Sequence, residues 1–285
     1  VQRINSTGLY YMNLSYFNVE DSSLIGDVYN SIDAEIAVDQ MLCSIGTYQP
    51  YEASTGCFIA EQGYFVANSG ALAQTPCSPG SYQGLTGESS CLITSPGYYS
   101  SFFASFIQTP ASLGHYVNST GAISQQTCLA GTYQNQTAQT LCIDTHPGYY
   151  TSSAGSPQQI PCSNGSYQPS VAETSCILSS PGNHVPMTAS TSQIPCSPGN
   201  YQPYTGQSSC IDASQGNYSI ILESTSQIPC PMGSYQPYTG QFRCILTSPG
   251  NYVSTNGSAF QTPCALGTYQ PFFESITCLD ADLGH

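Results

Sequence analysis

A glycine followed two residues later by an aromatic side chain recurs every 17 residues through most of this 285-residue chain. Cutting the sequence at Cys43 in steps of 17 gives fourteen complete blocks, the last ending at Asp280, and a partial fifteenth that begins at Ala281. Position four of every block is glycine, and position six is tyrosine in every complete block except for Phe65 and His184. A unit of 17 residues is too short to bury a core of its own. The pattern therefore predicts blocks that stack on one another as a rod.

Cysteine divides the blocks into two kinds. Seven A blocks carry cysteine at positions one and fifteen and use all 14 cysteines: Cys43 and Cys57, Cys77 and Cys91, Cys128 and Cys142, Cys162 and Cys176, Cys196 and Cys210, Cys230 and Cys244, Cys264 and Cys278. Seven B blocks have Ala, Thr or Ser at position one and glutamine at position fifteen: Gln74, Gln108, Gln125, Gln159, Gln193, Gln227 and Gln261. The two kinds alternate with a 34-residue period, except that two B blocks, 94–110 and 111–127, follow each other. This insertion of one whole block makes 17 residues the structural unit.

The spacing predicts disulfides within A blocks. The double B block stretches the distance from Cys91 to Cys128 to 37 residues, while every pair within a block stays 14 apart. Pairing between blocks would also leave Cys43 and Cys278 without partners. Each bridge closes a short loop and is expected to contribute about 3 kcal/mol. At the same place in B blocks, we expect the glutamine to hydrogen-bond the backbone.

Each block contains turn signals on either side of a short extended stretch. In block 196–212, Pro198-Gly199 and Thr205-Gly206 mark the turns, and Gly199 is expected at positive φ. The repeats lack sustained helical periodicity, so the predicted fold class is all-β and irregular: an elongated, disulfide-stapled tandem-repeat rod with two short strands per block. We expect the position-six rings to stack as a ladder along it. The predicted organisation is an N-terminal segment, residues 1–42, and a repeat region, residues 43–285.

Composition excludes several classes of function. Two basic residues against 16 acidic ones argue against nucleic-acid binding and against attraction to anionic membrane surfaces. No segment is long and apolar enough to insert into a membrane. Regularly paired cysteines indicate an oxidising, extracellular location at the cell surface, because zinc sites prefer CxxC knuckles with histidine partners. The sequence begins at Val1 and not at methionine, consistent with a removed signal peptide or a trimmed chain.

Seven Asn-x-Ser/Thr sequons support the extracellular interpretation and predict covalent N-glycans. They are Asn5, Asn13, Asn118, Asn135, Asn164, Asn217 and Asn256. We expect Asn13, Asn118 and Asn217 to be the best acceptors, the last two because they lie in turn-like sequence.

The first 42 residues lack the 17-residue period. Residues 8–20 and 32–38 alternate apolar and polar side chains and are predicted to form strands. They either cap the repeats or form an assembly strand that pairs with a neighbouring subunit. The second alternative predicts a head-to-tail homopolymer. If residues 1–8 of one copy followed His285 of another, Asn5-Ser6-Thr7-Gly8 would continue the partial fifteenth block as Asn118-Ser119-Thr120-Gly121 continues block 111–127. The rival interpretation is that the chain is a fragment of a longer array of repeats.

The A blocks resemble a known family. The openings CSPGSYQ at 77–83 and CSPGNYQP at 196–203, with the closing GQSSC at 206–210, are similar to the ephrin-receptor-like cysteine-rich repeats, themselves distantly similar to modules of tumour-necrosis-factor receptors. The resemblance covers all seven A blocks and implies extracellular, stalk-like modules in tandem arrays of surface proteins. The family usually adds a CxxC step that is missing here, and cysteine-free B blocks intervene. Neither its full pairing pattern nor any binding residue is transferred.

Little in the sequence indicates catalysis or a cofactor. His115, His146, His184 and His285 are scattered and are interpreted as drift of the repeat. Asp144, Asp212 and Asp280 close three A blocks, where turn capping is favoured over calcium between blocks. No nucleophile elbow, phosphate loop or metal-ligand cluster is present.

These features predict a structural, non-enzymatic extracellular glycoprotein that assembles into a surface filament. The alternative is an adhesin stalk or receptor ectodomain that binds a glycan or protein ligand. An unusual N-terminal segment and the lack of a non-repeating tip domain favour the filament.

Overall fold

The regular secondary structure of this chain consists of very short strands. The computed structural model describes residues 42–51 and 56–282, and the predicted strands within residues 1–41 lie outside this part. Within it, 28 strands of two residues each form fourteen antiparallel hairpins, one per complete block, and helices are absent. In every hairpin, positions five and six pair with positions sixteen and seventeen of the same block. The predicted fold class, all-β with disulfide-stapled tandem repeats, is confirmed.

The hairpins of the two kinds of block are alike. Those of the A blocks are β1 (Thr47–Tyr48) with β2 (Phe58–Ile59), β5 (Ser81–Tyr82) with β6 (Leu92–Ile93), β11 (Thr132–Tyr133) with β12 (Ile143–Asp144), β15 (Ser166–Tyr167) with β16 (Ile177–Leu178), β19 (Asn200–Tyr201) with β20 (Ile211–Asp212), β23 (Ser234–Tyr235) with β24 (Ile245–Leu246), and β27 (Thr268–Tyr269) with β28 (Leu279–Asp280). Those of the B blocks are β3 (Tyr64–Phe65) with β4 (Thr75–Pro76), β7 (Tyr98–Tyr99) with β8 (Thr109–Pro110), β9 (His115–Tyr116) with β10 (Gln126–Thr127), β13 (Tyr149–Tyr150) with β14 (Ile160–Pro161), β17 (Asn183–His184) with β18 (Ile194–Pro195), β21 (Asn217–Tyr218) with β22 (Ile228–Pro229), and β25 (Asn251–Tyr252) with β26 (Thr262–Pro263).

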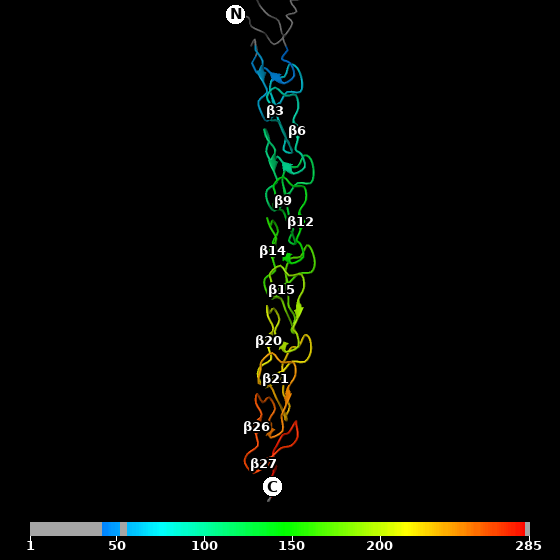
Figure 1. Cartoon of the computed structure of the whole chain (residues 1–285). Helices are drawn as coiled ribbons and strands as arrows, with labels where there is room; N and C mark the ends of the chain where they lie inside the picture. Colours follow the sequence, from blue (N-terminus) through cyan, green and yellow to red (C-terminus); the bar gives the residue numbers. More distant parts are fainter. Residues whose placement is uncertain (1–41, 52–55, 283–285) are drawn as a thin grey trace, which may run out of the picture. The chain divides into compact units, whose positions relative to one another are not determined.

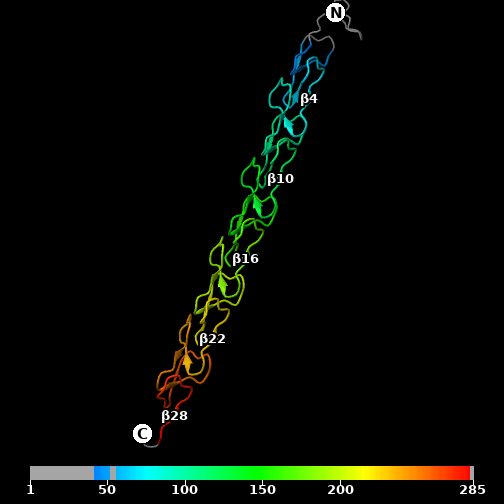
Figure 2. The ribbon, with the colours of Figure 1, turned by 90° about the vertical axis from the view of Figure 1, so that its right-hand side faces the viewer.

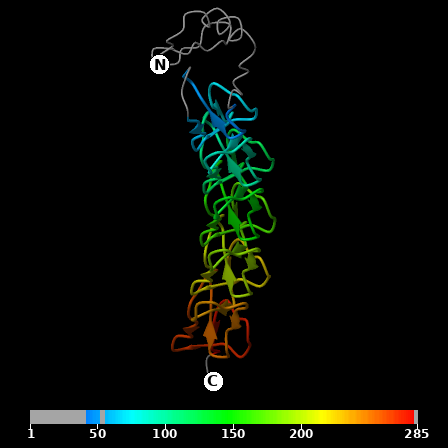
Figure 3. The same ribbon diagram turned by 90° about the horizontal axis from the view of Figure 1, so that it is seen from above.

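The chain divides into two units. Unit 1 holds the described residues up to Ser112 together with Tyr116–Gln126 and Thr137–Leu141. Unit 2 holds Leu113–His115, Thr127–Gln136 and the described residues from Cys142 onward. Within unit 2 the hairpins follow one another in sequence order, as the labels from β14 to β27 in Figure 1 and from β22 to β28 in Figure 2 show. Figure 3 shows the same order in the colours from green to red.

Four backbone hydrogen bonds join each block to the next. The N–H of position four donates to the carbonyl of position seven in the next block, and the N–H of position seven donates to the carbonyl of position twelve in that same next block. In return, the N–H of position one in the next block donates to the carbonyl of position four in the first block. The N–H of position eleven in the next block donates to the carbonyl of position one in the first block. From block 196–212 these bonds are Gly199 N to Ser219 O (2.7 Å), Gln202 N to Ser224 O (2.9 Å), Ala213 N to Gly199 O (2.9 Å) and Glu223 N to Cys196 O (3.0 Å).

The recurring glycine is required for two reasons. All position-four glycines described have φ between 73° and 95°, as predicted for Gly199, a conformation that L side chains rarely adopt. From Gly46 to Gly233, a Cβ atom would also lie well under 3.0 Å from the carbonyl oxygen of position eleven, two blocks later. Gly216, for example, faces the carbonyl of Gly257. At Gly250 and Gly267 the position two blocks later lies beyond residue 285, and nothing lies within 4 Å of an added Cβ.

The core is narrow, and its side chains come mainly from two positions per block. Position one is buried from Cys43 to Thr247. Position seven is a buried Val, Ser or Thr in B blocks and a glutamine in A blocks. Gln202 is typical: its Nε2 donates to Ser209 O (2.7 Å) and its Oε1 accepts from Tyr204 N (3.2 Å). Because the buried side chains are small, backbone hydrogen bonds account for much of the order between blocks.

The prediction that the position-six rings stack on one another as a ladder is wrong. The ring pairs found in the described part of the chain are Tyr48–Phe58, with centroids 5.8 Å apart, and Tyr51–Phe58, and neither joins two position-six rings. At two places, a position-six side chain lies near position fifteen of the following block. His184 does so at Cys210, and Tyr252 and Cys278 line one hollow.

Candidate functional site

The seven predicted disulfides are all present, and no cysteine is free. Each joins positions one and fifteen of one A block, with the two Cα atoms 5.7 or 5.8 Å apart. The bridges are Cys43–Cys57, Cys77–Cys91, Cys128–Cys142, Cys162–Cys176, Cys196–Cys210, Cys230–Cys244 and Cys264–Cys278. The predicted pairing within A blocks is therefore confirmed for all 14 cysteines.

The two cysteines of a bridge differ in burial. The position-one cysteine is buried in every A block except the last. At position fifteen, Cys57 of the first A block is exposed, whereas the later ones, such as Cys244, are half-buried. Block 213–229, which precedes the block of Cys244, has Tyr218 at position six, whereas the residues before Cys43 do not follow the repeat. The bridges thus lie at the edge of the narrow core, close to solvent.

The glutamines of the B blocks occupy the place of these bridges. In all seven, the position-fifteen Oε1 accepts a hydrogen bond from the backbone N–H of position two, at 2.7 to 2.9 Å. The donors are Glu61, Ser95, Ser112, His146, Ser180, Ser214 and Ser248. The expectation that glutamine substitutes for the sulfur bridge with a backbone hydrogen bond is confirmed.

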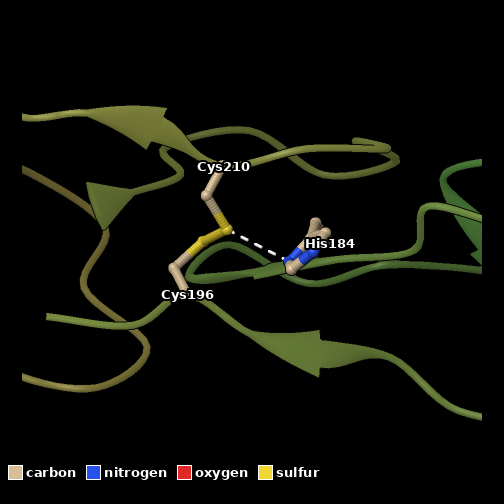
Figure 4. A group of neighbouring side chains, drawn as sticks. All are labelled: His184, Cys196 and Cys210. Carbon is tan, nitrogen blue, oxygen red and sulfur yellow. Dashed lines mark hydrogen bonds between the residues drawn. A yellow bond between two sulfur atoms is a disulfide. The ribbon is translucent and has the colours of Figure 1, made fainter. Parts of the chain in front are cut away.

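Next to one bridge, the side chain at position six is a histidine. His184 at the end of β17 points at the Cys196–Cys210 bridge of the following block, and its Nδ1 lies 3.1 Å from Cys210 Sγ (Figure 4). The ligand atoms of His184, Cys196 and Cys210 all lie within 4.8 Å of one another, and within the residues described this is the only such group of three or more His, Cys, Asp or Glu side chains. While the disulfide is intact, its sulfurs are not thiolates and offer a metal no strong ligand.

The other histidines and the block-closing aspartates are not brought into such a group. His115 Nδ1 lies 2.9 Å from the Leu113 carbonyl, and His146 Nδ1 lies 3.1 Å from Gln159 Oε1. His285 lies outside the described residues. Asp144, Asp212 and Asp280 close the hairpins as the second residues of β12, β20 and β28, and their side chains are exposed.

The sequons differ in how accessible they are. Asn118, Asn135, Asn164 and Asn256 are exposed, whereas Asn5 and Asn13 lie outside the described part. Asn217 is half-buried, and its Nδ2 donates to Ser214 Oγ (3.0 Å) and to Gln215 O (3.1 Å). Because Nδ2 is the atom that would carry a sugar, Asn217 is a weaker acceptor candidate than its turn-like sequence indicated.

Two structural positions were missed from sequence. The position-seven glutamine recurs in every A block, as Gln49, Gln83, Gln134, Gln168, Gln202, Gln236 and Gln270, and that recurrence was the available signal. Position eleven has positive φ even where it is not glycine, at Ala104, Ala138, Ala172, Ala189, Glu223 and Glu274. Glycine or alanine occupies position eleven in twelve of the fourteen blocks, and that preference for small residues was the available signal.

Comparison with known proteins leaves the family open. No protein-family model matches this chain, and no curated protein matches it at a significant level. In the part of the chain that the structure describes, no helix is long and apolar enough to cross a membrane. The many disulfides fit a secreted or extracellular protein.

Proposed function

We propose that this protein is a structural, non-enzymatic extracellular glycoprotein that forms a surface filament by head-to-tail association of identical chains. The observation that carries the proposal is the repetition of the same four backbone hydrogen bonds from block to block. A block joined in this way offers the same donors and acceptors to any repeat that follows it. A second copy of the chain can therefore use the same contacts.

The last complete block, 264–280, supports this mechanism. The space that a Cβ would enter is filled by a later carbonyl at every position-four glycine from Gly46 to Gly233, and it is open at Gly250 and Gly267. A repeat that follows, whether in the same chain or in another copy, fits there with the geometry already used within the chain. Such a head-to-tail contact does not close on itself and propagates as a fibre. The N-terminal segment that would supply the joining residues lies outside the described part.

The assembly is tested by substituting the open glycines in the 285-residue chain. Gly267→Ala places a methyl group where the carbonyl of an incoming repeat would lie, so fibres seen for the wild type by negative-stain microscopy should be lost. Gly257→Ala is the matched control, because Gly257 also has positive φ (73°) while its nearest neighbour is at an ordinary 3.7 Å. It carries the same backbone strain, about 1–2 kcal/mol, without blocking that face.

Sedimentation velocity over a range of concentrations gives the second measurement. Wild type and Gly257→Ala should form larger species as concentration rises, whereas Gly267→Ala should stay monomeric. Wild-type chains that remain single particles at every concentration would sink the filament proposal. Fibres of Gly267→Ala would refute the proposed contact.

A binding module is the second candidate, because block 94–110 exposes aromatic rings. Phe102, Phe103 and Phe106 are 78%, 68% and 52% exposed in the first of the two consecutive B blocks. Clustered exposed apolar side chains are typical of interaction sites. Phe102→Ser/Phe103→Ser should abolish retention on immobilised glycans or matrix proteins if the chain is an adhesin, whereas Phe272→Ser/Phe273→Ser, on the corresponding positions of the last block, should not.

A further inference from the structure

The bridge beside His184 differs chemically from the other bridges. In the blocks that precede the other A blocks from Cys77 onward, the corresponding position-six residue is an aromatic ring: Phe65, Tyr116, Tyr150, Tyr218 and Tyr252. Only the Cys196–Cys210 pair has an imidazole in this place, with Nδ1 3.1 Å from Cys210 Sγ. Two sulfurs and an imidazole nitrogen form a set of soft and borderline ligands of the kind that zinc prefers.

The block that holds this pair does not need its bridge to keep the hairpin. B blocks form the same hairpin and the same bonds between blocks without cysteine, as β21 and β22 do immediately after β20. None of the four bonds from block 196–212 to the next involves a sulfur atom. Cysteines are synthesised as thiols, so a dithiol form of this block precedes the bridge, and the cysteine-free B blocks indicate that such a form can fold.

The dithiol form needs only small movements to hold a metal. Tetrahedral zinc with Zn–S near 2.3 Å and Zn–N near 2.0–2.1 Å places its sulfurs about 3.8 Å apart and each sulfur about 3.6 Å from the nitrogen. The Cα atoms of Cys196 and Cys210 are 5.8 Å apart, and the sulfurs separate by rotation of the side chains once the bond between them is absent. Cys196 is buried, whereas Cys210 and His184 are half-buried, so the metal would lie at the edge of the core with a path to solvent.

We propose that the dithiol form of Cys196 and Cys210 binds one Zn²⁺ through both sulfurs and His184 Nδ1, with the fourth position left to water. Binding releases the two thiol protons to solvent. When the disulfide of a small thiol oxidises the site, the two thiolates lose two electrons and form the Cys196–Cys210 bond. The oxidant accepts the two electrons, takes up two protons from solvent and becomes two thiols, and Zn²⁺ leaves. Cys196 and Cys210 are thus joined either by a bound Zn²⁺ or by a disulfide bond. This inference does not depend on filament assembly.

The test uses the full chain and resolves each cysteine. The folded protein is reduced with a phosphine under anaerobic conditions, the phosphine is removed, and one equivalent of zinc is added before alkylation and peptide mapping. Zinc should slow the alkylation of Cys196 and Cys210 and leave the other six pairs unchanged. The oxidised chain should bind no zinc. His184→Tyr, which restores the residue of most other blocks, should lower zinc affinity by at least about tenfold, the smallest loss typical for a supporting residue of such a site.

A second variant tests whether a histidine at position six is sufficient to create a zinc site at another bridge. Tyr150 stands in the same relation to Cys162 and Cys176 as His184 does to Cys196 and Cys210. Tyr150→His should therefore create a second protected pair, Cys162 and Cys176. Equal protection of all seven pairs, which a reduced and unfolded chain would give, overturns the proposal. So does undiminished protection in His184→Tyr, or no gain in Tyr150→His.

Discussion

Blocks 196–212 and 213–229 have the same backbone, although only the first contains a disulfide. Both form a hairpin of two strands, each two residues long, in the same register: β19 with β20 and β21 with β22. Both place a glycine at positive φ, 95° at Gly199 and 79° at Gly216, against a carbonyl two blocks later. The A block is then closed by Cys196–Cys210, and the B block by the bond from Ser214 N to Gln227 Oε1 (2.7 Å). The glycine and the backbone bonds, and not the bridge, therefore determine the shape of the block.

The two blocks also differ at position seven. Gln202 bonds twice to the loop of its own block, whereas Ser219 Oγ donates to Asn200 O (3.0 Å) in the preceding block. A blocks thus have two internal closures, the bridge and the glutamine. B blocks rely more on their neighbours. Because the two kinds alternate, each B block lies next to an A block that is held by its own internal bonds.

The largest expected effect comes from the glycine that both blocks share. Gly199→Ala and Gly216→Ala should each destabilise by about 4 kcal/mol or more, because the new methyl group overlaps backbone that has no flexible side chain to move. Gly250→Ala, with the same φ but open space, should cost only about 1–2 kcal/mol. Native-state hydrogen exchange at the amides of Gln202 and Ser219 measures the loss. A clearly milder effect at Gly199 would show that the bridge also maintains the backbone.

Removal of the bridge ranks second. Cys196→Ala/Cys210→Ala should lose about 3 kcal/mol while the hairpin remains, because the bridge acts mainly on the unfolded chain. Cys196→Ala/Cys210→Gln converts the block to the B pattern and should regain about 1 kcal/mol through a bond to Ser197 N. Denaturant midpoints of the two variants provide the comparison. Loss of all exchange protection in the block would contradict the equivalence of A and B backbones.

The two glutamines should differ in importance. Gln202→Ala removes two bonds of a buried side chain and should cost about 2 kcal/mol, whereas Gln227→Ala removes the single bond to the backbone of Ser214 and should cost about 1 kcal/mol. Thermal unfolding of both variants measures the order. Equal losses would mean that position seven adds no internal closure to the A block.

The smallest expected effect is a gain. Ala172→Gly in an A block and Ala189→Gly in a B block should each stabilise by about 0.5–1 kcal/mol. Both alanines have positive φ, 58° and 54°, and relief of that strain is partly offset by the larger backbone entropy that glycine loses on folding. The gains should be equal in the two kinds of block, since position eleven makes the same bond in both, Ala172 N to Thr145 O and Ala189 N to Cys162 O. Unequal gains in the denaturant midpoint would locate a difference between the blocks that the backbone does not show.

Sequence was sufficient for several constraints that act inside one block, although not for the two bonds of the position-seven glutamine. The constant spacing of the cysteines predicted all seven bridges, Gln227 was assigned its backbone bond, and Gly199 its positive φ. It was insufficient for contacts between blocks. The rings of position six were expected to meet one another, and His184 was interpreted as drift although it lies 3.1 Å from a sulfur 26 residues away.

The reason lies in the nature of a repeat. Every position of a 17-residue block recurs with the same period, so the sequence by itself determined the unit, its two short strands and the closure between positions one or two and fifteen. The period is the same for any lateral offset between stacked blocks, and so it does not reveal which position of one block meets which position of the next. Only the tertiary structure decided this, through the four backbone bonds that join each block to its neighbour. Those bonds place the Gly216 backbone against the carbonyl of Gly257 and the imidazole of His184 against Cys210.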